Sequence, residues 1–456
     1  MKDRDVVERC AALVAEFGRG LSRPEQKFLQ DLVFGILCSQ SSLLSEISRA
    51  IAQGKNVRTV LKRLDFNLGR YDLKKPYERA QSHLLRRVDE SYLFIFDPSE
   101  IVKPFAKKME GLAKVRDASE KPRIVTTAIG KKVMVPVLKP GYPLRVAIAM
   151  SPTGDVLPIE LSLYSCASEF FVSENDEYIN ALETLIHKTN FEPTLILDRE
   201  FDAFVLIRHL CSLRQKFVIR VTANRKYREA GSVNKPATPT YERHEMIDKF
   251  SYLRAQAIIT YTRQGQTQEL LFSLKAAQVE LLPEAKKGGD VRDRGDLEAL
   301  TLVQVKIHKA DGTPTLYLLT NSRPSNGADL ERIARSYLAR WNIEEYIRFL
   351  KQHFGLEGFL VRDLGRMKNL ISAVYIATVV MHSLTNRASA RGEKTHHRLV
   401  HRSLEVGSKK RFRDFFLYAY GRGLSRIALA NKKLLNPRKV GFSQSGKNQM
   451  ALSLPD

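Results

Sequence analysis

The most informative stretch of the sequence runs Tyr337-Leu-Ala-Arg340-Trp341-Asn-Ile-Glu344-Glu-Tyr-Ile-Arg-Phe-Leu-Lys351. Taken as a helix, at about 100° per residue, it places four polar side chains on one stripe roughly 60° wide. They are Tyr337, Arg340, Glu344 and Lys351. Such a stripe can hold a metal-bound phosphate, because the carboxylate binds the cation while Arg and Lys bind phosphate oxygens. The alternative is a solvent-exposed helix whose charges pair with one another.

Two aspartates elsewhere in the chain follow apolar runs that are typical of strands. The run Tyr92–Phe96 ends at Asp97, and the run Thr194–Leu197 ends at Asp198. Sheets of α/β proteins most often place functional side chains at such positions, although an isolated Asp there can also form a turn or cap a helix. Together with Glu344, the two would supply the oxygen ligands for two Mg²⁺ ions roughly 3.5 to 4 Å apart, the arrangement that drives phosphodiester displacement.

The composition indicates a folded protein with an anionic polymer as its partner. In 456 residues, 74 Lys and Arg stand against 50 Asp and Glu, a net charge of +24. The hydrophobic fraction of 43% excludes a disordered polybasic chain and a multi-span membrane protein. From Leu360 onward there are 19 basic and 5 acidic residues, so 19 − 5 = +14 lies in the last segment. Nucleic acid is the simplest partner for such a charge.

The pattern of apolar residues divides the chain into regions. Residues 1–85 show helical spacing, and residues 86–215 alternate strands and helices around Ser151–Asp155, which has the composition of a hairpin turn. Residues 216–320 show strand patterns, with a loop over Lys286–Gly295, and helices follow. The apolar run Leu370–Leu384 is too short for a typical membrane span and is expected to be a buried helix.

These motifs resemble a known family. The spacing Tyr337-x2-Arg340-x3-Glu344-x6-Lys351 is similar to the YREK signature of insertion-sequence DDE transposases of the IS-four type. Phe96-Asp97-Pro-Ser, followed by Lys108-Met-Glu-Gly-Leu112, resembles the first Asp block of that family. Leu195-Ile-Leu-Asp198-Arg199-Glu-Phe-Asp202 resembles the second block, in which Asp-Arg-Gly is commoner. The resemblance covers about residues 90–360.

The resemblance implies a fold and an arrangement of domains. It implies an α/β, ribonuclease-H-like mixed five-stranded sheet with a β-rich insertion in the 344 − 198 = 146 residues between the second Asp and the Glu. The implied domains are a helical, transposon-end-binding region (1–85), a catalytic domain (86–215 and 321–370), the insertion (216–320) and a basic helical region for dimerisation or DNA contact (371–456).

The resemblance also implies the roles of the site residues. Asp97, Asp198 and Glu344 would be catalytic and would ligate two Mg²⁺ or Mn²⁺ ions. The residues expected to contact DNA are Tyr337, Arg340, Lys351, Trp341 and Arg199. For Arg199, a salt bridge alone is an equal alternative.

The implied activity is cut-and-paste DNA transposition by hydrolysis and strand transfer. The partners would be double-stranded DNA, namely transposon inverted-repeat ends and target DNA, and a second copy of the chain in a synaptic homodimer. Neither a membrane nor a nucleotide cofactor is expected, because the amino terminus is charged and no Gly-rich phosphate loop precedes a Lys-Ser/Thr pair. Scattered cysteines favour an intracellular location, and the resemblance to insertion-sequence enzymes implies the cytoplasm of a prokaryote. Two alternatives remain: a ribonuclease-H-like nuclease without strand transfer, and a domesticated, non-catalytic DNA-binding protein.

Overall fold

The computed structural model describes residues 2–126, 130, 132–223, 225–231, 239–263, 266–282, 299–309, 312–385, 390–404 and 416–431. Its helices are α1 (Asp3–Phe17), α2 (Arg23–Ser39), α3 (Leu44–Ile51), α4 (Val57–Arg70), α5 (Lys74–Leu85), α6 (Glu174–His187), α7 (Phe204–Ser212), α8 (Arg243–Phe250), α9 (Gly327–Leu338), α10 (Trp341–His353), α11 (Leu364–Leu384), α12 (Ala390–Leu404) and α13 (Leu417–Ala430), with short 3₁₀ turns η1 (Arg199–Phe201) and η2 (Leu356–Gly358). Its strands are β1 (Leu93–Val102), β2 (Ala113–Arg116), β3 (Arg123–Thr126), β4 (Lys132–Val135), β5 (Leu138–Met150), β6 (Val156–Leu163), β7 (Thr194–Leu197), β8 (Phe217–Arg220), β9 (Lys226–Glu229), β10 (Tyr241–Glu242), β11 (Ser251–Arg263), β12 (Gln266–Leu281), β13 (Leu300–His308) and β14 (Thr315–Thr320).

The centre of the molecule is a five-stranded mixed sheet in the order β6-β5-β1-β7-β8. Strands β1, β7 and β8 run parallel, β5 is antiparallel to β1, and β6 is antiparallel to β5. This order and these directions confirm the expected ribonuclease-H-like α/β fold. The apolar runs Phe94–Phe96 and Leu195–Leu197 are almost completely buried, which is why they form neighbouring central strands.

The hairpin between β5 and β6 is formed by the turn residues expected from the sequence. Ser151 donates its backbone N–H to Asp155 at 2.9 Å, and Gly154 has a φ of 86°, a conformation that glycine adopts without steric cost. Because this hairpin is tight, β6 lies at one edge of the five-stranded core next to β5.

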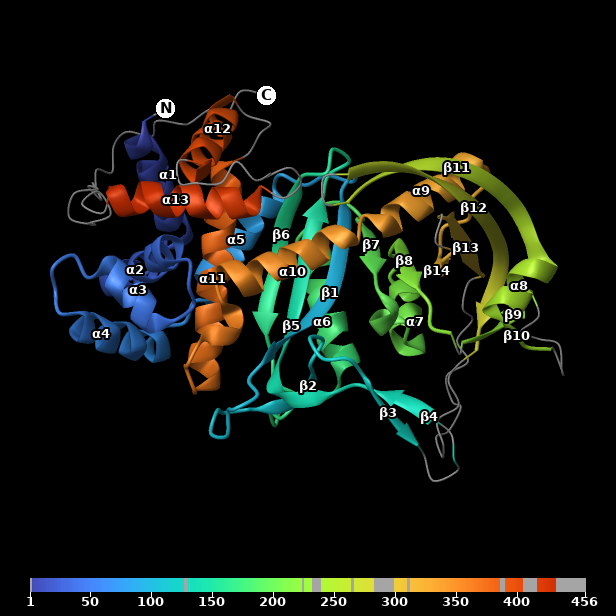
Figure 1. The fold of residues 1–456 in the computed structure, drawn as a ribbon, viewed down its shortest axis with the longest axis horizontal. Coiled ribbons are helices and arrows are strands. Elements are labelled where there is room, and N and C mark those ends of the chain that lie inside the picture. The colour runs from blue at the N-terminus through green and yellow to red at the C-terminus, as the bar shows by residue number, and fades with distance from the viewer. Residues whose placement is uncertain are drawn as a thin grey trace.

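The insertion does not form a separate sheet. Strand β14 pairs antiparallel with β8, with Leu319 opposite Ile219, so the core sheet continues through β14, β13 and β12. With β9, β10 and β11 at that end, and β2 paired with β5 at the other, it becomes a twelve-stranded sheet among the described residues. Figure 1 shows the amino-terminal helices at one end of the core and β11–β14 at the other. The loop expected over Lys286–Gly295 lies outside the described residues.

Helix α11 is the core helix that joins the amino-terminal helices to the sheet. It packs against α2, α4, α5 and β6. Within the described chain, α11 is long and apolar enough to cross a membrane, as is the sharply bent pair α2–α3 if taken as one segment, but 78% of the apolar window of α11 is buried in the protein. The interpretation of Leu370–Leu384 as a buried helix is therefore confirmed.

Polar contacts between α5 and the sheet also join the amino-terminal helices to the core. The Tyr77 hydroxyl donates to Glu160 of β6 at 2.8 Å, and Gln81 donates to the same carboxylate at 3.1 Å. Lys188, beyond the end of α6, donates to Gln81 at 2.5 Å. Buried polar groups are stable when they are paired in this way.

Buried His382 of α11 makes the stability of the fold depend on pH. Burial, and to a smaller extent Arg87, lowers the pKa of His382 from 6.5 to about 3. Below about pH 6.5, His382 is protonated in the unfolded chain but stays neutral in the folded chain. The free energy of unfolding therefore falls by up to about 1.4 kcal/mol per pH unit until about pH 3. We expect the free energy of unfolding of His382→Gln to lack this fall between pH 7.5 and 5. Urea unfolding at pH 7.5, 6 and 5 measures it in both proteins. Equal slopes for the two proteins would contradict this expectation.

Candidate active site

Asp97 lies inside strand β1, and its position corrects the expectation that the strand ends there. Strand β1 runs on to Val102, with Asp97 opposite Val146 of antiparallel β5. Only the parallel pairing with β7 stops before Asp97, at the pair Phe96–Leu197. The apolar run ends at Asp97 because one neighbouring strand ends there, which opens a place for a polar side chain at the sheet surface.

Asp198 follows β7 directly and begins the 3₁₀ turn η1. Because Phe96 and Leu197 are partners in the parallel ladder, the next residues, Asp97 and Asp198, lie side by side where that ladder ends. Asp97 remains in β1, paired with β5, whereas Asp198 follows the end of β7. Their side chains are largely buried, at 16% and 17% exposure. The register of two neighbouring strands thus brings together aspartates that are about a hundred residues apart in sequence.

Glu344 comes from the first turn of α10, and the stretch around it is not one continuous helix. Helix α9 ends at Leu338, and Arg340 donates its backbone N–H to Tyr337 at 3.0 Å in an i to i+3 pattern that tightens the chain. Helix α9 then packs on β7 and β8, whereas α10 packs on β1 and β5 (Figure 1). The break therefore lets Tyr337 reach Asp198.

The guanidinium of Arg340 occupies the centre of the site. Its Nη1 lies 3.0 Å from Asp97 Oδ2 and 3.9 Å from Asp198 Oδ2, and its Nη2 lies 2.6 Å from Glu344 Oε1. We call Asp97, Asp198 and Glu344 the carboxylate triad. Arg340 is 9% exposed, so this cation is held by the triad in a largely buried place. The sequence placed Arg340 at the site but not between the carboxylates.

Tyr337 holds the second aspartate of the triad. Its hydroxyl donates to Asp198 Oδ1 at 2.9 Å. Burial, followed by the charge of Asp198, raises the pKa of Tyr337, so the phenol keeps its proton and remains a hydrogen-bond donor. The aspartate is thereby oriented by a buried neutral group on one side and by Arg340 on the other.

The electrostatics of the triad favour a cation. Burial, together with the like charges of Asp198 and Glu344, raises the pKa of Asp97 to about 8, although Arg340 acts in the opposite direction. Burial alone would lower the pKa of Arg340, but the surrounding carboxylates raise it. One guanidinium therefore does not fully compensate three acids in a desolvated space.

The remaining residues expected to contact DNA surround the triad. Lys351 Nζ lies 3.2 Å from Glu357 Oε1, on the turn that follows α10, and is not in the group around Arg340. Trp341 is 40% exposed, and Arg199 is exposed beside Asp198. The structure therefore brings Tyr337 and Arg340 onto the triad, while Lys351, Trp341 and Arg199 lie outside it.

Two further carboxylates near the site were missed by the sequence analysis. Burial raises the pKa of Glu100 to about 7, with a further contribution from Glu200 and an opposing one from Lys351. Burial, followed by the charge of Asp198, also raises the pKa of Glu200. The available signal was the place of Glu200 in the second Asp block, where Gly is commoner. Both residues add negative charge around the triad.

A buried ion pair fixes the chain after Asp198. Arg225 Nε lies 2.6 Å from Asp202 Oδ1, and the pair is almost fully buried. The backbone N–H and hydroxyl of Thr222 donate to Asp202 Oδ2 at 2.7 and 2.9 Å. The turn that carries Asp198 is thus fastened to the first residues after β8. Sequence patterns gave no sign of this pair, because its members are separated by two elements.

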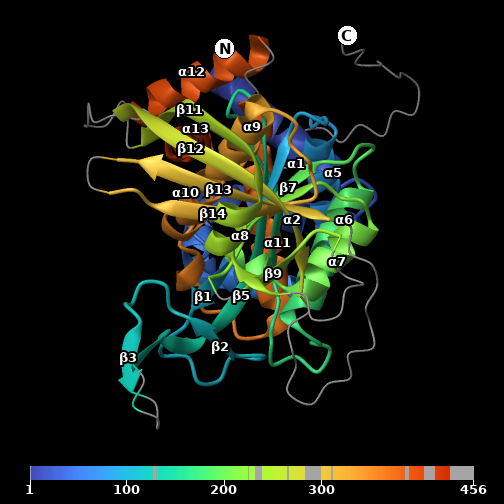
Figure 2. The same cartoon turned by 90° about the vertical axis from the view of Figure 1, so that its right-hand side faces the viewer.

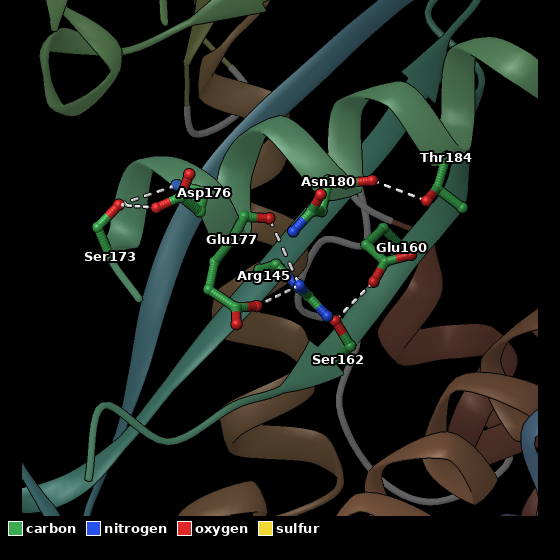
Figure 3. Close-up of polar contacts among 8 residues, drawn as sticks. All are labelled: Arg145, Glu160, Ser162, Ser173, Asp176, Glu177, Asn180 and Thr184. Carbon is green, nitrogen blue, oxygen red and sulfur yellow. Dashed lines mark hydrogen bonds and ion pairs between the residues drawn. The ribbon is translucent and has the colours of Figure 1, made fainter. Parts of the chain in front are cut away.

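The opposite face of the sheet is held by a second polar network (Figure 3). Arg145 lies next to Val146, the β5 partner of Asp97, and points to the other face because side chains alternate along a strand. Its Nη1 lies 2.6 Å from Glu177 Oε2 of α6, and its Nε donates to Ser162 of β6 at 2.9 Å. Helix α6 is thereby attached behind the strand that supports Asp97.

The side chains of the triad fit a divalent cation by their chemistry. All are oxygen donors, and all reach one positively charged group within 4.0 Å. As arranged here, however, no group of three or more Asp, Glu, His or Cys side chains in the described part of the chain could hold a metal ion. In this arrangement the guanidinium of Arg340 contacts all three carboxylates.

Comparison with known proteins gives a family for part of the chain. Residues 166–380 match the family model described as "Transposase DDE domain". The match includes Asp198 and Glu344 and begins after Asp97, which the fold brings to the same place. No curated protein matches the sequence. One matching solved structure is described as "Cryo-EM structure of piggyBac transposase synaptic complex with hairpin DNA", at 11% identity over 86% of this chain and 76% of that chain, with a TM-score of 0.35.

Proposed function

We propose that this chain, a DNA transposase with its DDE domain in residues 166–380, performs cut-and-paste transposition at the carboxylate triad. A DDE transposase is a metal-dependent DNA nuclease and strand transferase. The observation that carries the assignment of the site is the convergence of Asp97, Asp198 and Glu344 on one guanidinium. Membership of the IS-four type, with its YREK signature, belongs to the same proposal.

The triad would hold two Mg²⁺ or Mn²⁺ ions. When bound, such ions activate an attacking oxygen and stabilise the leaving oxygen of a phosphodiester. The chain's own contribution is to orient and desolvate the ligands: Tyr337 fixes Asp198 by its hydrogen bond, and the ladder of β1 with β5 holds the backbone of Asp97. Rigid support of this kind lowers the cost of assembling the site.

Arg340 would exchange partners when DNA enters. In the structure its guanidinium pairs with carboxylates of the triad, and a guanidinium can form the same fork onto a phosphate. We infer that Arg340 leaves the carboxylates for a phosphate near the cleaved end. Lys351, Trp341 and Arg199 would complete the DNA contacts.

The reaction would proceed in two displacements on DNA. Water first cuts one strand at the transposon end and frees a 3′-hydroxyl, and that hydroxyl then attacks a target phosphodiester. The helical region 1–85 would bind the inverted-repeat ends, and the basic region 371–456 would serve dimerisation or general DNA contact. Joining two ends implies a homodimer, because two active sites must be related by symmetry. We place the protein in the cytoplasm of a prokaryote, in contact with DNA, with no nucleotide cofactor and no membrane.

A strand-transfer assay tests this function. Purified protein is incubated with Mg²⁺, a target plasmid and duplex DNA taken from either side of the coding region. We expect nicks that end in a 3′-hydroxyl, followed by covalent joining of that end to the plasmid. Cutting without joining would favour the nuclease, and tight binding without cutting would favour the domesticated DNA-binding protein.

A further inference from the structure

A two-stranded ribbon projects from the core between β2 and β5. We call residues 121–126 and 132–136 the β3–β4 ribbon. In this ribbon Ile124 pairs with Met134 and Val125 pairs with Val133. All residues of β3 and β4 are exposed, so neither face of the ribbon is covered by the described parts of the chain. Figures 1 and 2 both show it extending away from the body of the protein.

Large apolar side chains of the ribbon are exposed to solvent. Ile124 and Met134, opposite one another on one face, are 68% and 71% exposed, and Val125 and Val133 on the other face are 47% and 39% exposed. An isolated two-stranded hairpin is marginally stable in water. Adjacent exposed apolar side chains on both faces of such a ribbon favour an interaction site. The ribbon is therefore expected to have a partner.

The charge of the ribbon identifies the chemistry of that partner. Its described residues, 121–126 and 132–136, include three basic residues and no acidic residue. Lys121, Arg123 and Lys132 are exposed. At the base of the ribbon, Lys139 lies 2.7 Å from Asp117 and is also paired with Glu120, so the nearby acids are neutralised. A polyanion complements this surface, whereas a second copy of a chain of net charge +24 is repelled by it.

The distance from the triad suits a duplex that leaves the active site. Strand β5 begins at Leu138, eight residues before Val146, the partner of Asp97. At about 3.3 Å per residue this is roughly 26 Å, or about eight base pairs of DNA. A two-stranded β-ribbon also fits the width of the DNA major groove.

We propose that the β3–β4 ribbon is a DNA-binding arm that enters a groove of the duplex about eight base pairs from the cleaved phosphate. Lys121, Arg123 and Lys132 contact phosphates, while Ile124 and Met134 contact sugars and thymine methyl groups. The position along the duplex rests on the proposed function, but the binding of DNA by the ribbon does not.

Binding measurements with duplexes of two lengths test the arm. The full-length charge variant Lys121→Ala/Arg123→Ala/Lys132→Ala is compared with Lys121→Arg/Arg123→Lys/Lys132→Arg, which keeps every charge. On a 40-base-pair duplex we expect the first variant to bind at least about tenfold more weakly. The salt slope, which is the slope of the logarithm of the binding constant against the logarithm of the salt concentration, should become smaller in magnitude by about 2 to 3, because each phosphate contact contributes about 0.9. The charge-keeping variant should retain both. A duplex of about 12 base pairs centred on the cleavage position, too short to reach the arm, should bind all proteins equally.

The apolar face is tested separately. Ile124→Ser/Met134→Ser should weaken binding of the long duplex about fivefold without changing the salt slope. Unchanged affinity of both alanine and serine variants for the long duplex would overturn the proposal. So would a loss of self-association in sedimentation velocity with DNA affinity intact, which would assign the ribbon to a second copy.

Circular dichroism melting and Mn²⁺-dependent cutting of the short duplex show whether each variant is folded. If the unaltered protein fails to cut DNA at all, the proposed catalytic function fails. The affinity and salt-slope comparison still decides the role of the ribbon, because binding is measured without metal.

Discussion

Glu344→Gln is expected to lower the rate of DNA cutting by at least about 10³-fold, because losing one carboxylate ligand removes about 4 kcal/mol of transition-state stabilisation. DNA affinity should change by less than about threefold, since phosphate contacts and not the triad dominate binding. Asp97→Asn should behave in the same way. The measurement is single-turnover cleavage of end-labelled duplex in Mg²⁺, with affinity measured in EDTA.

The neighbouring residue offers a matched control. Glu345 carries the same side chain one position along α10, is 40% exposed and pairs with Arg348. Glu345→Gln should therefore cut DNA at the normal rate. If Glu344→Gln retained more than about a tenth of normal cutting, or if both variants lost activity equally, Glu344 would not be a ligand of the catalytic ions.

Arg340→Gln is expected to tighten Mn²⁺ binding by about 10²-fold in the absence of DNA. Two unit charges about 4 Å apart attract by about 4 kcal/mol at an effective dielectric constant of about 20. Arg340 holds such contacts with the triad and must be displaced before an ion can enter. Without the guanidinium, the carboxylates repel one another and bind a cation more strongly. Titration calorimetry, or the electron paramagnetic resonance signal of free Mn²⁺, gives the affinity.

The same variant should show two further changes. Its melting temperature in EDTA should fall and should be restored by Mn²⁺, and its strand joining should fall because the fork to phosphate is lost. Arg348→Gln, which removes an exposed ion pair with Glu345 on the same helix, should alter neither property. Weaker or unchanged Mn²⁺ binding by Arg340→Gln would show that the guanidinium does not compete with the ion.

Much of the fold could be predicted from local patterns. The buried runs before Asp97 and Asp198, the hairpin at Ser151–Asp155 and the helix Leu370–Leu384 are each visible in sequence, because burial of a strand or helix leaves a short-range apolar period. The β3–β4 ribbon was not predicted, since both of its faces are exposed and its apolar residues do not report burial. The break between α9 and α10 was also missed, because the two residues between them, Ala339 and Arg340, adopt helical angles without continuing the helix.

The sequence by itself identified the side chains that we propose for the chemistry: three carboxylates, a tyrosine and an arginine, in an order and spacing that resemble those of DDE enzymes. Only the tertiary structure decided how these groups meet. The register of β1 with β7 aligns Asp97 with Asp198, and the break after α9 sends Tyr337 to one and Arg340 to the centre. Electrostatic interactions depend on distances in space, and the packing of segments far apart in sequence sets those distances. No local sequence pattern therefore records which charged groups interact.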